Sequence, residues 1–260
     1  MRALSNVKRI VVKVGTSTLT YENGRLNIRG IEKLVRVLAD LRNSGHEIVL
    51  VSSGAIGVGA SKLAFDHRPQ EVREKQAAAS VGQPLLMEIY DEFFRKYNQT
   101  IGQILLTKNV LINQQMHENA VNTFSTLFEY GVIPIVNEND TVVTDEILFG
   151  DNDTLSAYIA DIVEADLLLL LTDIDGLYDK NPKEFPEAKL LHEVTELTNE
   201  VRAAAGGVSS NRGTGGMQTK LLAVEVAAKA GAKTIIMNGA EPAEIYRVLE
   251  GEQIGSYFDC

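Results

Sequence analysis

Residues 9–17 read RIVVKVGTS, a short and mainly β-branched run that ends in glycine and two hydroxyl residues. Such runs recur along the chain with little alternation of apolar and polar residues, which is typical of strands buried on both faces of a parallel sheet. The further runs are EIVLVSS (47–53), IGQILLT (101–107), GVIPIVN (131–137), ADLLLLLTD (165–173) and KTIIMNG (233–239).

Segments with helical spacing lie between these runs. In 28–43, apolar residues recur at intervals of three and four positions, and 110–130, 151–163 and 218–230 show the same spacing. Alternating strands and helices predict an α/β fold, a three-layer αβα sandwich with a mostly parallel central sheet. In such sheets, ligands bind beyond the carboxyl ends of the strands, so we expect the functional residues in the loops that follow these runs.

The composition of the chain argues against several classes of function. Of 260 residues, 45% are apolar and 23% are charged, which is an ordinary globular mixture. The formal net charge of −10 argues against general binding to nucleic acid or to an anionic membrane. Cys260 is the single cysteine, which excludes a disulfide framework. The longest apolar run is far below the roughly 20 residues that cross a bilayer, so we expect a soluble cytoplasmic protein.

Two strand ends carry glycines that could approach a phosphate. Lys13 lies inside the apolar run 9–14, where burial of an ammonium without an anionic partner is costly. An edge-strand lysine that reaches solvent is the alternative. The glycines of 52–59, SSGAIGVG, do not follow the dinucleotide pattern G-x-G-x-x-G. They allow either a close anion at a helix N-terminus or close packing of a helix on the sheet.

Asparagine and aspartate side chains gather in VNENDTV (136–142) and FGDNDTLSA (149–157). They exceed what a turn and one helix cap require. Asn and Asp side chains can bind the ammonium and the carboxylate of an amino acid, and a carboxylate can orient a catalytic lysine. A metal or glycosidase site is the alternative for paired carboxylates. After the run 165–173, Thr172 and Asp173 fit either a turn or a contact with a nucleotide.

The glycine-rich stretch GGVSSNRGTGGMQTK (206–220) ends in a lysine that does not directly follow a glycine. The P-loop pattern G-x-x-x-x-G-K-[ST] is therefore not met. Either a flexible linker or a different kind of phosphate site fits this stretch.

In combination, these segments resemble the amino acid kinase family over nearly the whole chain. The resemblance is carried by VVKVGTSTLT (11–20), LVSSGAIGVG (50–59), VNENDTV, FGDNDTLSA and GTGGMQTKL (213–221). Within the family it is greatest to the members that phosphorylate L-glutamate, because aspartokinases and acetylglutamate kinases carry other glycine patterns after the first strand. It implies ATP-dependent phosphorylation of the γ-carboxylate of L-glutamate to L-glutamyl 5-phosphate, the first step of proline biosynthesis.

The resemblance also implies roles for individual residues. Lys13 and Lys220 would be the cations at the transferring phosphoryl group, and Asp153 would hold them in place. The implied substrate-binding residues are Ser53, Gly54, Asn137, Asp140 and Asn152. The implied ATP-binding residues are Lys13, Gly15, Thr172, Asp173, Thr214, Gly215, Gly216, Met217, Gln218, Thr219 and Lys220. Mg²⁺ would arrive with ATP, without metal ligands from the protein.

At the level of the whole chain, the resemblance implies a single domain, 1–260. An amino-acid-binding lobe would span about 1–165 and a nucleotide-binding lobe about 166–260. It further implies a homo-oligomer, a dimer or tetramer, with feedback inhibition by proline. The net charge leads us to expect no nucleic-acid or membrane partner. Two features depart from the family: Leu148 stands where a lysine is common, and no C-terminal PUA domain follows.

Three other functions are alternatives to glutamate phosphorylation. The same fold could phosphorylate another small carboxylic acid or carbamate. A non-catalytic amino-acid sensor has no use for two lysines and a carboxylate suited to phosphoryl transfer. A nicotinamide-dependent oxidoreductase is disfavoured by the glycine spacing.

Overall fold

The computed structural model describes residue 4 and residues 6–21, 25–67, 69–142, 152–205 and 216–260. Their strands form one eight-stranded sheet in the order β3-β4-β2-β1-β5-β7-β8-β6, which is parallel except that β8 pairs antiparallel with β7. The strands are β1 (Arg9–Val14), β2 (Glu47–Ser52), β3 (Ile101–Leu106), β4 (Ile133–Glu138), β5 (Leu167–Thr172), β6 (Glu193–Val194), β7 (Lys233–Asn238) and β8 (Ser256–Phe258).

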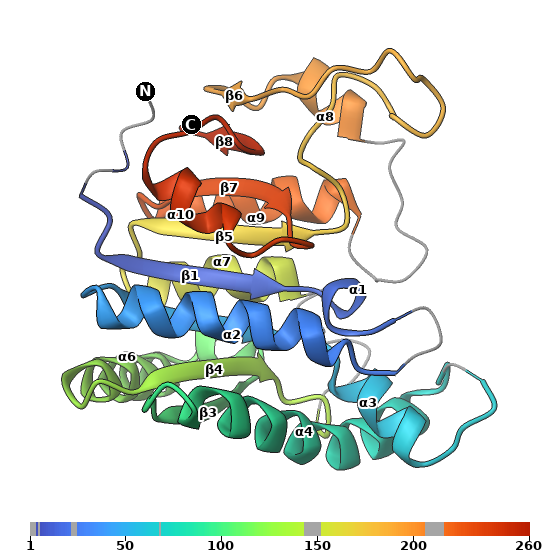
Figure 1. The fold of residues 1–260 in the computed structure, drawn as a ribbon, viewed down its shortest axis with the longest axis vertical. Helices are drawn as coiled ribbons and strands as arrows, with labels where there is room; N and C mark the ends of the chain where they lie inside the picture. The colour runs from blue at the N-terminus through green and yellow to red at the C-terminus, as the bar shows by residue number, and fades with distance from the viewer. Residues whose placement is uncertain (1–3, 5, 22–24, 68, 143–151, 206–215) are drawn as a thin grey trace.

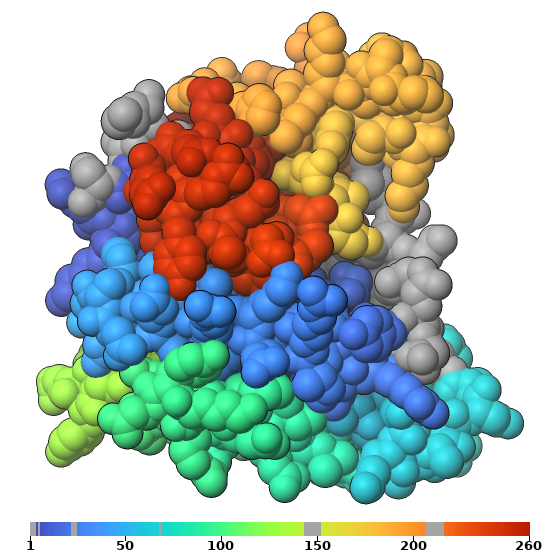
Figure 2. Space-filling model, viewed as in Figure 1, coloured from blue at the N-terminus to red at the C-terminus, as the bar shows by residue number. Residues whose placement is uncertain are grey.

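Helices cover both faces of the sheet, which confirms the αβα sandwich. In Figure 1, α2, α4 and α10 lie in front of the sheet, and α6, α7 and α9 lie behind it. On the front surface, α2 runs as a blue band between α4 and the C-terminal segment (Figure 2). The helices are α1 (Thr16–Leu19), α2 (Ile28–Asn43), α3 (Ala55–Lys62), α4 (Val72–Arg95), α5 (Asn109–Ile112), α6 (Gln114–Glu129), α7 (Asn152–Ile162), α8 (Asn199–Ala205), α9 (Met217–Lys229) and α10 (Glu244–Leu249).

The six strand-like runs of the sequence all form strands, and the helix expected over 28–43 is α2. The expected helix over 110–130 is two helices, because the Asn113 carboxamide accepts a hydrogen bond from the N–H of Met116 at 2.9 Å and caps α6. Helix α4 was not predicted from the sequence, because it contains Pro84, a residue that usually breaks a helix. Strands β6 and β8 were not predicted either, because they are only two and three residues long.

Strand β1 lies in the middle of the sheet, between β2 and β5. Alternate residues of β1 face opposite layers: Val12 packs in the core that includes α2, and Val11 packs in the core that includes α7 and α9. Lys13 shares the face of Val11, since side chains alternate with a period of two. The edge-strand interpretation of Lys13 is therefore wrong, and its side chain points toward α7 and α9 at the carboxyl end of a central strand.

Helices α3 and α4 pack closely through two glycines. A β-carbon added at Gly59 would lie 1.8 Å from the carbonyl oxygen of Ala78, and one added at Gly82 would lie 1.8 Å from that of Ala55. Any larger side chain would force the helices apart. This contact fixes α4 against α3 close to the end of β2, the part of the sheet where the expected substrate residue Ser53 lies.

We expect Gly59→Ala to destabilise the fold by about 1–3 kcal/mol, because overpacking moves backbone atoms apart. Gly57→Ala is the matched control in the same helix, since its nearest neighbour, Thr16 Cγ2, would lie at 3.8 Å. The control should be neutral or stabilising. Urea denaturation of both variants measures this, and equal free energies of unfolding would contradict the close-packing account.

Candidate active site

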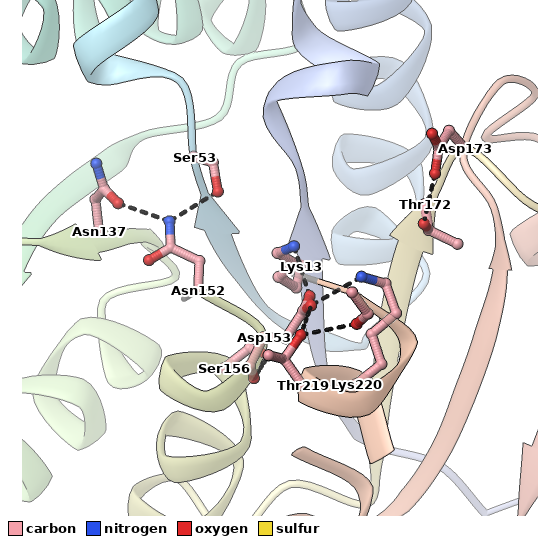
Figure 3. Close-up of polar contacts among 11 residues, drawn as sticks. Lys13, Ser53, Asn137, Asn152, Asp153, Ser156, Thr172, Asp173, Thr219 and Lys220 are labelled. Atoms are coloured by element: carbon pink, nitrogen blue, oxygen red, sulfur yellow. Dashed lines mark hydrogen bonds and ion pairs between the residues drawn. The ribbon is translucent and has the colours of Figure 1, made fainter. Parts of the chain in front are cut away.

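Three charged side chains from distant parts of the chain meet at the carboxyl end of β1. Lys13 extends from β1, Asp153 from the first turn of α7, and Lys220 from the first turn of α9 (Figure 3). Lys13 Nζ lies 2.5 Å from Asp153 Oδ1, and Lys220 Nζ lies 2.9 Å from Asp153 Oδ2. Each carboxylate oxygen therefore holds one ammonium group. We call these three residues the lysine clamp.

The lysine clamp is deeply buried. The exposed fractions of Lys13, Asp153 and Lys220 are 7%, 0% and 6%. Burial by itself raises the pKa of Asp153, but the charges of Lys13 and Lys220 and their hydrogen bonds outweigh it and hold this pKa well below its usual range. Two positive charges and one negative charge leave the clamp with a net charge of +1, in a chain whose formal net charge is −10. The site can therefore attract an anion.

The start of α9 explains why Lys220 needs Asp153. The N-cap residue Gly216 offers no side chain to cap the helix, and Thr219 Oγ1 donates to the Gly216 carbonyl at 2.8 Å. A cation in the first turn opposes the helix dipole, so Lys220 is unfavourable there unless an anion is close. Asp153 supplies that anion, and the buried side chain of Met217 fixes the turn in the core.

A second polar cluster adjoins the lysine clamp. Asn152 Nδ2 donates to Ser53 Oγ at 2.8 Å and to Asn137 Oδ1 at 2.9 Å (Figure 3). Ser53 follows β2, and Gly54 behind it has φ +106°, a left-handed conformation that favours glycine and turns the chain into α3. Because Asn152 directly precedes Asp153, the start of α7 joins the two clusters.

Asp140 lies shortly after β4, beyond Asn137. Burial raises the pKa of this carboxyl to about 6. A partly buried carboxylate of this kind gains from an incoming cation, because an opposite charge nearby offsets the cost of desolvation.

The structure brings most of the expected site residues to this end of the sheet. Gly15 lies beside Lys13, since a β-carbon built on it would lie 3.6 Å from Lys13 Nζ. Thr172 ends β5 and Asp173 directly follows it, and Thr172 Oγ1 donates to Asp173 Oδ1 at 3.2 Å. Residues 216–220 form the start of α9, with Gln218 exposed. Thr214, Gly215 and Leu148 lie outside the described residues.

Sequence reasoning missed two supporting residues, both on α4. Asn137 Nδ2 donates to Gln83 Oε1 at 3.0 Å, and Tyr90 Oη lies 2.8 Å from Ser52 Oγ. Both contacts are buried, and burial raises the pKa of Tyr90 so that its hydroxyl stays neutral. The sequence offered one signal for them, a Gln and a Tyr among the apolar residues of a single helix.

Comparison with known proteins places this site in a family. The model of the amino acid kinase family matches residues 8–238. The chain belongs to the amino acid kinase family. It is 54% identical to glutamate 5-kinase of Clostridium perfringens, with 99% of this chain and 97% of that protein covered. It is 52% identical to glutamate 5-kinase of Listeria monocytogenes, with 98% and 94% covered.

Solved structures of other kinases share the fold. Isopentenyl phosphate kinase of T. acidophilum superimposes with a TM-score of 0.65 at 16% identity, with 96% of this chain and 100% of that chain covered. Carbamate kinase from Giardia lamblia superimposes with a TM-score of 0.66 at 16% identity, with 98% and 99% covered. UMP kinase from Bacillus anthracis gives 0.66 at 18% identity, with 97% and 96% covered. Identities this low support the αβα architecture alone.

The described residues contain no group of three or more His, Cys, Asp or Glu side chains arranged to bind a metal ion. Within the same residues, no helix combines the length and apolar character needed to cross a membrane.

We expect Asp153→Asn to lower the free energy of unfolding by about 3–5 kcal/mol, because it leaves two buried ammonium groups without their anion. The matched control is Asp161→Asn, an exposed aspartate of the same helix, which should change stability little. Urea denaturation at pH 7 measures both. The lowered pKa of Asp153 means that its contribution is complete only above about pH 5 and is lost progressively as the pH falls below that value. Equal stability of the two variants would show that the clamp does not hold the fold together.

Proposed function

We propose that this protein transfers the γ-phosphoryl group of ATP to the γ-carboxylate of L-glutamate, forming L-glutamyl 5-phosphate. The observation that carries the proposal is the lysine clamp, in which two buried ammonium groups from β1 and α9 share the one carboxylate of Asp153. Relatives more than 50% identical over nearly their whole length are glutamate 5-kinases, and this supports the choice of acceptor.

Charge is the main obstacle to this reaction, since the acceptor carboxylate and the transferring phosphoryl group are both anions. Lys13 and Lys220 offset their repulsion and neutralise charge on the phosphoryl oxygens. The acceptor is already ionised, so no general base is required. Asp153 is ill suited to be one, because both its oxygens face ammonium groups and its pKa is held low. Its role is to position the two lysines.

On the acceptor side, Ser53, Gly54, Asn137, Asn152 and Asp140 are proposed to bind glutamate. Asp140 is suited to the α-ammonium group, because a nearby cation would offset the desolvation cost of its ionised carboxylate. The hydroxyl and carboxamide groups are suited to the carboxylates and to the ammonium protons.

On the donor side, the start of α9 points backbone N–H groups toward the lysine clamp, an arrangement suited to nucleotide phosphates. Gly15 offers bare backbone beside Lys13, and Thr172 and Asp173 are proposed to contact the nucleotide. Residues 214–219 complete the proposed nucleotide segment. Mg²⁺ would arrive with ATP and would lower the charge of its phosphates.

Further features belong to the same proposal. The amino-acid lobe is proposed to span about 1–165, and the nucleotide lobe about 166–260. We further propose a cytoplasmic homo-oligomer, a dimer or tetramer, that is inhibited by proline and supplies the first intermediate of proline biosynthesis.

A panel of acceptors tests the function. ADP release is measured with ATP, Mg²⁺ and one acid at a time: L-glutamate, L-aspartate, N-acetyl-L-glutamate or carbamate. L-Glutamate should stimulate ADP release far more than the other acids. Stimulation by a different acid, or by none, would contradict the proposal.

We expect Lys220→Met to lower kcat by about 10²–10³-fold, the range for removal of one group that stabilises charge in a transition state. Glutamate binding, followed by calorimetry, should survive. Lys229→Met is the control, because Lys229 is an exposed lysine in the last turn of the same helix. Unchanged turnover in Lys220→Met would remove Lys220 from the catalytic residues.

The pKa of Asp140 predicts how glutamate use depends on pH. In the free enzyme this carboxyl should gain its proton as the pH falls through about 6, and a neutral carboxyl attracts the α-ammonium group less. The value of kcat/KM for glutamate should therefore fall below pH 6. Asp140→Asn should lower kcat/KM at pH 8 and abolish this acidic decline. A decline that persists in Asp140→Asn would assign it to another group.

A further inference from the structure

A line of three carboxamides extends from α4 into the glutamate-binding cluster. Asn137 Nδ2 donates to Gln83 Oε1 at 3.0 Å, and Asn152 Nδ2 donates to Asn137 Oδ1 at 2.9 Å. The exposed fractions of Gln83 and Asn137 are 8% and 4%. We call Gln83, Asn137 and Asn152 the amide ladder.

Hydrogen bonding gives the amide ladder a direction. A carboxamide has an acceptor oxygen on one side and a donor nitrogen on the other, so the partner of one side fixes where the other points. Gln83 accepts from Asn137, which turns the Asn137 oxygen toward Asn152. That oxygen in turn holds the nitrogen of Asn152. The orientation of Asn152 therefore depends on the Gln83 oxygen, which is connected to it through the side chain of Asn137.

The direction of the ladder decides which hydrogen-bonding atoms of Asn152 and Ser53 are available to a substrate. With its nitrogen engaged by Asn137 and by Ser53, Asn152 turns its carbonyl oxygen away from both (Figure 3). Among the described residues, none is hydrogen-bonded to that oxygen, so it is available to accept. Ser53 Oγ accepts from Asn152, which leaves the hydroxyl proton of Ser53 available to donate. An acceptor beside a donor suits a group that carries an ammonium next to a carboxylate.

We propose that Gln83 is a positioning residue that fixes the amide ladder with the Asn152 oxygen facing the substrate, so that the site selects acids bearing an α-ammonium group. The inference rests on the proposed function and adds the origin of its selectivity. Without the acceptor of Gln83, Asn137 and Asn152 can both flip. Asn152 would then present a donor, which disfavours an ammonium group and tolerates an acid without one.

The surroundings of Gln83 keep it in place. The preceding residue, Gly82, contacts the backbone of α3 too closely for any side chain. One face of α4 also brings Tyr90 to Ser52, whose hydroxyl donates to the Ser53 carbonyl at 3.1 Å. Since Ser52 has one proton to give, Tyr90 is the donor in their contact. Helix α4 therefore supports the substrate cluster at two points, through Asn137 and through the backbone of Ser53.

The test compares L-glutamate with glutarate, which is the same diacid without the α-amino group. Binding constants of both are measured by calorimetry, and KM and kcat by ADP release. The variants are Gln83→Met, which keeps the shape and removes the acceptor, and Gln83→Glu, which keeps an acceptor. Gln115→Met, an exposed glutamine on α6, is the control for the chemical change. Circular dichroism and thermal unfolding show whether each variant is folded.

We expect Gln83→Met to reduce the preference for glutamate over glutarate by about tenfold, the effect of one unpaired buried polar group. The KM for ATP and kcat at saturating glutamate should stay within about twofold. Gln83→Glu should restore most of the preference, and Gln115→Met should match the wild type.

An unchanged preference for glutamate over glutarate in folded Gln83→Met would overturn the inference. A rise in the KM for ATP as large as the rise in the KM for glutamate would also overturn it. If Gln83→Met does not fold, Gln83→Glu decides, because loss of the preference despite its acceptor would also overturn it. The wild-type protein separates the two proposals: absence of glutamate-dependent ADP release defeats the proposed function, whereas the binding preference still tests the amide ladder.

Discussion

The carboxylate of Asp153 is the interaction on which the rest of the site depends. It is fully buried, and each of its oxygens holds an ammonium group from a different part of the chain. Without it, Lys13 could not lie in the central strand of the sheet, and Lys220 would oppose the helix dipole at the start of α9. One carboxylate therefore ties β1, α7 and α9 together and holds in place the two ammonium groups that leave the site with a net positive charge.

The two halves of the site use different physical means. The lysine clamp acts through charge, which is strong inside a dry interior and tolerates small changes of geometry. The amide ladder acts through hydrogen-bond direction, which demands a fixed orientation and supplies selectivity. Asn152 and Asp153 are consecutive residues at the start of α7, so one helix end places the acceptor-binding atoms next to the cations. This proximity suits a reaction that depends on positioning.

Local signals were sufficient to predict the layers of the fold, whereas the roles of Lys13, Asp153 and Lys220 were expected from the resemblance to the amino acid kinase family. Unbroken apolar runs mark buried parallel strands, and a lysine within such a run needs an anion. The contribution of α4 could not be predicted in this way. Gln83 meets Asn137 from 54 positions away, and the close packing of Gly59 against Gly82 helps to hold α4 where they meet. The helix end at Asn113 was not predicted for a different reason. Its capping role depends on local backbone geometry, which the periodicity of apolar residues does not show.

The lysine clamp is proposed to direct phosphoryl transfer to a carboxylate oxygen of glutamate, and isotope tracing tests this proposal directly. The wild-type protein is given ATP, Mg²⁺ and L-glutamate labelled with ¹⁸O in the γ-carboxylate, and hydroxylamine traps the acyl phosphate by attack at its carbon. The phosphate that leaves should carry one ¹⁸O atom, because the bridging oxygen came from glutamate. Released phosphate without the label would mean that water or another group is the acceptor, and would contradict the account.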